Sequence, residues 1–321
     1  MYLLILDTHD RLITSDARRL CLYDIRETAG RICEVEHASE PPFFDQSDPG
    51  ERLALGGGVI ARSITPPGRS THWVETPTTV GLYAATDLAR IAVFDLGQRL
   101  DHQSLAVSAD GRMLASVQRG AGAVVFDAAT GAELWHLDGS IASGPSWSPN
   151  GRHLALGETS QGPGALTIID TTPDAGGAPQ KTKLPPPRSG AGLYDSPFRS
   201  AFCAGGTRVV FTSSSWGVAG VAMYDVAARA EIWSTKMPTT DDEGAEHWSA
   251  PELDLALDGA LVLVGQDGCV QAFGAADGRE RSRLEFERAD SRHFAADSKR
   301  RGIWITRGGE PAFVGFASDW A

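Results

Sequence analysis

The sequence predicts an all-β protein folded as a single β-propeller over residues 1–321, with seven four-stranded blades favoured and eight left open. Short apolar runs alternate with turn residues, and a unit of about forty residues recurs along the chain. No segment has the length and apolar spacing of an amphipathic helix. A four-stranded sheet of this size cannot bury both faces alone, so each unit has to stack on copies of itself.

The clearest unit spans residues 104–139 and contains four runs of strand type joined by tight connections. Its first connection, 108–111, ends in Asp-Gly, which supplies the positive-φ residue that a tight hairpin needs. The third run, 123–126, is β-branched and aromatic, which suits a half-buried pleated surface. Four consecutive strands in one short span are what a propeller blade requires.

The first hairpin turn of this unit recurs through the chain. We place these turns at residues 10, 50, 111, 151, 206, 259 and 299, with steps of 40, 61, 40, 55, 53 and 40 residues. A period near forty is typical of propeller blades. The longest step contains an additional turn-like segment, 76–79. We interpret 41–103 as one elaborated blade, whereas two truncated blades there would make eight.

A second marker is an aromatic residue or Ile followed by Asp at the end of the third strand. It occurs as Tyr23-Asp24, Phe94-Asp95, Phe126-Asp127, Ile169-Asp170 and Tyr224-Asp225, with degenerate copies at Phe273-Gly274 and Phe316-Ala317. A third marker is a Trp on the fourth strand, at Trp135 and Trp233.

With these markers the chain resembles the WD40-like and quinoprotein-like β-propellers over nearly its whole length. Residues 127–135 resemble the turn and fourth strand of those blades. The Gly-His pair and the terminal Trp-Asp of WD40 repeats are missing. The resemblance therefore implies the architecture, and not the hydrogen-bond network of that family.

Charge and composition narrow the range of partners. The net charge is −12 and the pI about 5.1, which argues against nucleic acid and anionic membranes, because both attract basic surfaces. The apolar start, residues 1–6, has no basic leader and is too short for a membrane span. We expect it to form a strand that closes the ring beside the last blade. The Ala-, Gly-, Arg- and Asp-rich composition is typical of a bacterial cytoplasmic protein.

The cysteines and the low-complexity segment are interpreted as scaffold features. The four Cys have no metal-ligand spacing, so we expect reduced thiols, with a Cys21–Cys33 disulfide as the alternative. Residues 171–197 form a Pro/Gly-rich stretch that we predict to be an insertion loop within the propeller. Its run of three prolines, 185–187, favours polyproline II structure.

Catalytic motifs are absent from the sequence. The Gly run at 56–58 is not followed by Gly-Lys-Ser/Thr, so it does not indicate a phosphate-binding loop. There is no G-x-S-x-G and no H-E-x-x-H. The eight His fall at different strand positions in different units. We therefore expect no catalytic residue, no metal and no cofactor.

The sequence predicts a non-enzymatic interaction scaffold or regulatory subunit. We expect a protein or peptide partner, in a bacterial signalling or defence assembly, to bind blade loops on one face of the ring. Trp and Arg are typical interface anchors, and the candidates in loops are Arg19, Arg119, Trp216, Trp248 and Arg307. The alternative is a propeller enzyme, a lactonase-like hydrolase or quinone-dependent dehydrogenase, with an axial metal or cofactor. Its residues would be adjacent in space and not in sequence.

Overall fold

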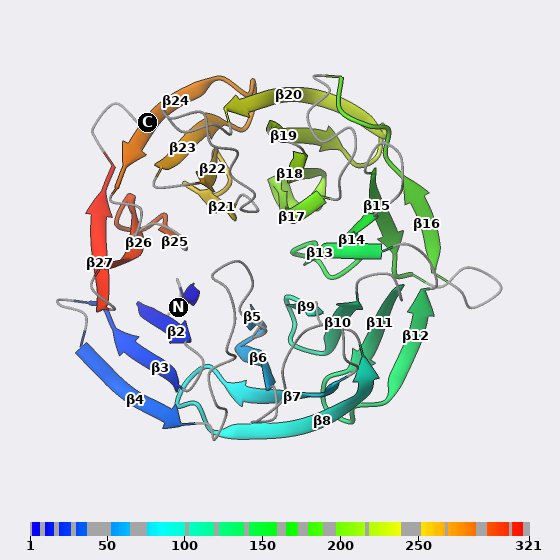
Figure 1. The fold of residues 1–321 in the computed structure, drawn as a ribbon, viewed down its shortest axis with the longest axis vertical. Helices are drawn as coiled ribbons and strands as arrows, with labels where there is room; N and C mark the ends of the chain where they lie inside the picture. Colours follow the sequence, from blue (N-terminus) through cyan, green and yellow to red (C-terminus); the bar gives the residue numbers. More distant parts are fainter. Residues whose placement is uncertain are drawn as a thin grey trace. The chain divides into compact units, whose positions relative to one another are not determined.

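The protein folds into seven consecutive antiparallel sheets, the seven-bladed β-propeller architecture that the sequence predicts (Figure 1). The computed structural model describes residues 2–6, 10–15, 19–26, 30–36, 53–64, 76–99, 103–118, 122–137, 141–158, 165–172, 179–188, 197–215, 218–238, 252–266, 269–286, 294–307 and 310–316. Within these residues six sheets have four strands and the last has three. The eight-bladed alternative is therefore wrong.

The first of two compact units, Met1–Ile141, holds three sheets. Their strands are β1 (Tyr2–Leu6), β2 (Arg11–Ser15), β3 (Arg19–Asp24) and β4 (Gly30–Glu36), then β5 (Leu53–Gly56), β6 (Val59–Ile64), β7 (Thr76–Ala84) and β8 (Arg90–Arg99), then β9 (Gln103–Val107), β10 (Met113–Gln118), β11 (Gly122–Asp127) and β12 (Glu133–Leu137).

The second unit, Ala142–Ala321, holds the other four sheets. Their strands are β13 (Ile141–Trp147), β14 (His153–Glu158), β15 (Ala165–Asp170) and β16 (Gln180–Lys183), then β17 (Pro197–Cys203), β18 (Arg208–Ser215), β19 (Val218–Asp225) and β20 (Ala230–Pro238), then β21 (Glu252–Ala256), β22 (Leu261–Gln266), β23 (Cys269–Gly274) and β24 (Glu280–Glu285), and last β25 (Phe294–Asp297), β26 (Gly302–Arg307) and β27 (Glu310–Gly315). The 3₁₀ turn η2 (Ala204–Gly206) joins β17 to β18.

One backbone hydrogen bond recurs in all seven sheets. The residue that follows the third strand donates its N–H to the carbonyl of the residue that precedes the second strand. The donors and acceptors are Ile25 and Asp10, Ala85 and Gly58, Ala128 and Arg112, Thr171 and Arg152, Val226 and Thr207, Ala275 and Ala260, and Phe316 and Arg301. This bond fixes a common register, so equivalent positions can be compared from sheet to sheet.

The hydrophobic core lies between successive sheets within each unit. In the first unit, Leu82 of β7 packs with Leu105 and Leu114 of the next sheet. In the second unit, Val210 of β18 packs with Val262 of β22 in the same way. Apolar residues on both faces of the inner strands are thereby removed from water, which is the main favourable term in folding.

An aromatic residue on the fourth strand packs over a glycine of the next sheet in both units. Phe94 of β8 lies against Gly131, and Trp233 of β20 lies against Gly278. Both glycines have positive φ, 71° and 66°, and a Cβ at either one would collide with the ring. The predicted Trp135 and Trp233 do lie on fourth strands, β12 and β20.

The second blade differs from the sequence-based interpretation. Its first hairpin turn is at Gly57-Gly58, not at residue 50, because Leu53–Gly56 is the first strand, β5. The step to the turn at 111 therefore falls from 61 residues to 54. The turn-like segment 76–79 lies inside β7, and the Phe94-Asp95 marker lies on the fourth strand, β8, instead of the third.

Two other expectations are corrected, and the expected reduced state of the cysteines is confirmed. β1 pairs with β2 as the first strand of its own sheet, so it is not the closing strand of the last blade. The segment 171–197 is not a loop throughout, because it contains β16, the fourth strand of its sheet. All four Cys are free. Cys33 faces Leu22 across the strand pair, while Cys21 faces Glu34. The thiols of Cys21 and Cys33 therefore lie on opposite faces of the sheet, and the alternative disulfide between them is wrong.

Candidate functional site

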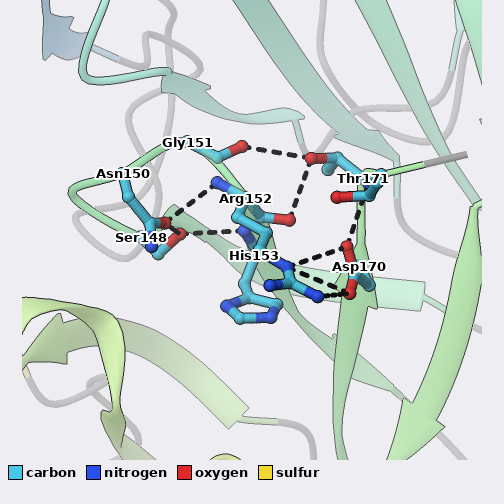
Figure 2. A network of polar contacts seen from close by, with 8 residues as sticks. Ser148, Asn150, Gly151, Arg152, His153, Asp170 and Thr171 are labelled. Carbon is cyan, nitrogen blue, oxygen red and sulfur yellow. Dashed lines mark hydrogen bonds and ion pairs between the residues drawn. The ribbon is translucent and has the colours of Figure 1, made fainter.

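A network of polar contacts fixes the turn between β13 and β14 (Figure 2). The Ser148 hydroxyl donates to Asn150 Oδ1 at 2.7 Å and accepts the backbone N–H of His153 at 2.8 Å. The same Asn150 oxygen accepts the N–H of Arg152 at 3.0 Å. Ser148 is fully buried, so its hydroxyl satisfies the His153 amide in place of water.

The same network joins this turn to the end of β15. Arg152 donates through Nη2 and Nε to Asp170 Oδ2, at 2.9 and 3.2 Å. The Thr171 hydroxyl bonds the carbonyls of Arg152 and Gly151, at 2.9 and 3.1 Å. The guanidinium hydrogen bond lowers the pKa of Asp170 to about 2, so this carboxylate stays charged at neutral pH.

The network brings Ser148, His153 and Asp170 together, but not as a nucleophilic triad. A triad requires the imidazole to bond the hydroxyl on one side and the carboxylate on the other. Here Ser148 bonds the backbone N–H of His153, and Asp170 bonds Arg152. The imidazole instead stacks on Phe202 of β17, with ring centroids 6.3 Å apart. Its buried Nδ1 has no hydrogen-bond partner among the described residues.

The third sheet repeats this turn without a histidine. Ser108 Oγ donates to Asp110 Oδ1 at 2.6 Å and accepts the N–H of Met113 at 2.9 Å. Met113 begins β10 as His153 begins β14. The turn therefore depends on the Ser and on the Asp or Asn, and an imidazole is dispensable.

We expect His153→Met to make the unfolding free energy less sensitive to mild acid. Burial disfavours the imidazolium and lowers the pKa of His153. Below the unfolded pKa, near 6.5, the unfolded chain gains a proton that the folded chain resists, so stability is lost as the pH falls. Denaturant titrations at pH 7.5 and 5.5 should show a smaller loss for the variant than for the unaltered chain. Equal losses for the two chains would contradict a role of His153 in the acid sensitivity.

The first strands of the second unit carry a charged cluster. Arg199 of β17 donates Nε and Nη2 to the two carboxylate oxygens of Glu252 on β21, at 3.1 and 3.0 Å. Asp254, two residues further along β21, accepts the backbone N–H of Leu255 and that of Ala296 on β25, each at 2.7 Å. These contacts link three successive first strands.

The carboxylates of this cluster are held by hydrogen bonds within the protein. Each oxygen of the Glu252 and Asp254 carboxylates accepts a hydrogen bond from the protein. In the parts of the chain that the structure describes, no group of three His, Cys, Asp or Glu is arranged to hold a metal ion. The paired charges and the Asp254 hydrogen bond tie sheet to sheet.

A β-bulge lies between the third and fourth strands of five sheets. In each, two adjacent third-strand residues pair with two fourth-strand residues that are separated by one residue. That middle residue has no partner on the third strand. The skipped residues are Ile32, Ile91, Leu134, Ile232 and Arg281. The four aliphatic ones, which we call the bulge row, are between 37% and 51% exposed.

The part of the bulge row that lies in the first unit is the candidate interaction surface. Three members, Ile32, Ile91 and Leu134, lie on the fourth strands of the three successive sheets of the first unit. Val93, two residues after Ile91, is also about half exposed. Single exposed aliphatics are ordinary, but here the same kind of residue recurs at one exposed position of successive sheets.

The structure places only two of the five sequence-predicted site residues. Arg19 is the first residue of β3 and Arg307 the last of β26, and both are exposed. They belong to different units. Arg119, Trp216 and Trp248 lie outside the described residues. The structure therefore does not assemble these five into one site.

Sequence reasoning missed the charged first strands and the bulge row. A signal for the first was present in β21, where charged and apolar residues alternate over Glu252–Ala256. The bulges have no comparable signal, because a bulge depends on which residues of two strands pair.

Comparisons with known proteins support the fold class. The class that the seven sheets define is the β-propeller. Among solved structures, the chain is similar to Kuenenia stuttgartiensis hydrazine synthase, with a TM-score of 0.69 and 12% identity over 99% of this chain and 96% of that one. This likeness concerns the fold alone. No protein-family model matches the chain, and no curated protein does. No helix among the described residues is long and apolar enough to cross a membrane.

Proposed function

We propose that this chain is a non-enzymatic protein-interaction module or regulatory subunit of the WD40-like and quinoprotein-like kind, cytoplasmic, with a protein or peptide partner. The observation that carries the proposal is the bulge row. Large aliphatic side chains remain exposed at one repeated position, which suits contact with another protein.

The polar groups support the same proposal. Side chains with potential for chemistry are engaged in building turns and joining sheets: Ser148 in its turn, Glu252 with Arg199, and Asp254 with two backbone amides. The enzyme alternative needs carboxylates with free oxygens near the first strands. Those of Glu252 and Asp254 are occupied by protein donors.

The test is quantitative affinity purification of the tagged full chain from its native host. We expect a stoichiometric protein partner. Ile32→Glu combined with Leu134→Glu places charge in the bulge row of the first unit, and Trp216→Ala combined with Trp248→Ala removes the predicted loop anchors. Loss of a true anchor should weaken binding by roughly 2 kcal/mol or more.

The matched control is Arg281→Ala, which alters the same bulge position in a sheet where the residue is already charged. Partner loss in the first double variant assigns the bulge row, and loss in the second assigns the loops. A preparation with no partner that instead contains a stoichiometric metal or a chromophore would overturn the proposal in favour of the enzyme alternative.

A further inference from the structure

The last sheet has an open edge among the described residues. Six sheets carry a fourth strand on their third strand, whereas the outermost strand of the last sheet is its third strand, β27, drawn in red in Figure 1. β27 pairs with β26 in regular register from Arg307 and Glu310 to Gly302 and Gly315, without a bulge.

Phe313 occupies a position that is covered in every other sheet. The recurrent backbone hydrogen bond aligns it with the third-strand residues Leu22, Leu82, Val125, Ile168, Met223 and Ala272. Those six are at most 3% exposed, whereas Phe313 is 39% exposed. Each of the six faces a residue of a fourth strand, so what Phe313 lacks is that strand.

The ring of Phe313 is nevertheless held in place. It packs against Trp304 of β26, with centroids 5.3 Å apart. It also lies across Gly302, where any Cβ would collide with the ring and with the carbonyl of Val314. The exposed apolar surface is therefore fixed before any partner arrives, which reduces the ordering cost of binding.

Other outer edges in the chain are protected against strand addition. Bulges and charges are the usual devices that prevent an edge from pairing with another chain. Five fourth strands are bulged, and the sixth, β16, is four residues long and contains Lys181 and Lys183. β27 has no bulge, and its one charged residue and its proline, Glu310 and Pro311, lie at its start, away from Phe313 and Gly315.

Backbone groups on the open edge of β27 are available for pairing. Phe316 donates its N–H to the carbonyl of Arg301, the residue before β26, so by alternation Gly315 and Phe313 direct theirs to the opposite side. In other sheets the residue equivalent to Gly315, such as Asp127 or Gly274, donates its N–H toward the fourth strand. Neither Gly315 nor Phe313 has such a partner within the described residues. Pro311 has no N–H, which confines donation to these two amides.

The six existing fourth strands define what fits. The residue opposite the penultimate third-strand position is charged in all six: Arg31, Arg90, Glu133, Lys181, Glu231 and Glu280. The residue opposite the Phe313 position is small or Trp: Cys33, Ala92, Trp135, Thr182, Trp233 and Ser282.

The surroundings of β27 select among these options. The turn before β26 presents the exposed Lys299 and Arg301 beside the end of β27 where an antiparallel strand would enter. An acidic residue suits that end. Since Phe313 is larger than its counterparts, a small residue suits the position opposite it.

We propose that a partner protein adds a strand antiparallel to β27 and completes the last sheet. That strand has an acidic residue opposite Val314, then an aliphatic residue, then a small residue opposite Phe313. This site uses none of the bulge-row residues and neither of the loop tryptophans Trp216 and Trp248, so its failure and the failure of the proposed function are distinguishable.

The test measures amide hydrogen exchange of the full chain with and without a synthetic nonapeptide. The peptide has the sequence of residues 130–138 with Ser in place of Trp135. Its Glu-Leu-Ser segment supplies the acidic, aliphatic and small residues of the proposed strand in order. In the free chain the Phe313 and Gly315 amides should exchange much faster than those of Ala312 and Val314. The peptide should slow both, and versions that keep Trp or replace Glu133 by Lys should bind roughly tenfold more weakly.

Phe313→Lys should abolish peptide binding, because it places a charge on the open edge. The matched control is Ile232→Lys on the bulged edge of β20, which should leave peptide binding unchanged. The exchange measurement uses the unaltered chain and so remains informative if Phe313→Lys does not fold.

Three results would overturn the proposal. Slow exchange of Phe313 and Gly315 in the monomeric free chain would mean that the chain covers its own edge. Slow exchange that is lost on dilution of a dimer would assign the edge to a second copy. No slowing by any of the three peptides at about 1 mM would exclude strand addition of this chemistry.

Discussion

Gly278→Ala is expected to lower the unfolding free energy by about 3 kcal/mol, well beyond the loss from a glycine of the same conformation elsewhere. Two terms add. A φ of 66° costs a residue with a Cβ about 1 kcal/mol. The new Cβ would also lie 2.5 Å from Trp233 Cδ2, and overpacking of this kind costs about 2 kcal/mol. The ring cannot swing aside freely, because Trp233 Nε1 donates to the carbonyl of Ala275 at 3.1 Å.

Gly151→Ala is the control that isolates the ring contact. Gly151 has a φ of 69°, and a Cβ there would meet nothing within 4 Å. Gly151→Ala should therefore lower the unfolding free energy only by the cost of a positive φ, about 1 kcal/mol. In a Trp233→Leu background the added cost of Gly278→Ala should fall to the same value, as a double-mutant cycle by denaturant unfolding would show. Equal losses for the two single variants would contradict the contact.

The fold was predictable because its determinants are local. An Asp-Gly turn and an aromatic-Asp strand end act within a few residues, and the strand ends at Asp127 and Asp170 are confirmed. The errors arose where two local signals compete. Pro49-Gly50 and Gly57-Gly58 both suit a turn, and only pairing of β5 with β6 selects the second. Phe94-Asp95 has the marker sequence, but pairing with β7 makes it part of a fourth strand.

The candidate surfaces were less predictable because they depend on pairing. Ile232 is exposed because Met223 and Tyr224 pair with Trp233 and Glu231 and skip it. Phe313 is exposed because no described strand covers its edge. In sequence either residue suits the core. The ion pair of Arg199 with Glu252 joins residues 53 positions apart, a separation at which one sequence carries no pairing information.

Asp297→Ala is expected to lower the unfolding free energy by about 4 kcal/mol, in the range for breaking a buried ionic network. Asp297 is 1% exposed and accepts three hydrogen bonds. Oδ1 takes the backbone N–H of Arg300 at 2.9 Å, and Oδ2 takes Arg300 Nη1 at 3.0 Å and Trp304 Nε1 at 3.1 Å. Removing the carboxylate leaves the buried indole N–H without an acceptor, which adds a desolvation cost to the lost bonds.

Asp277→Ala provides the comparison in which geometry is similar and burial differs. Asp277 also accepts a nearby backbone N–H, that of Arg279, and pairs with Arg281 at 2.8 Å, but its side chain is 37% exposed. Water can replace the Asp277 carboxylate as an acceptor. Asp277→Ala should therefore lower the unfolding free energy much less than Asp297→Ala does. Asp297→Asn should lower the unfolding free energy by an amount between those of the two alanine variants. Its amide oxygen still accepts one hydrogen bond, but the ion pair with Arg300 is gone. If the Asp297 and Asp277 alanine variants lose equal stability in denaturant titrations, burial does not set the strength of the Asp297 network. Removal of the indole donor by Trp304→Phe should then cost no more than the change in packing.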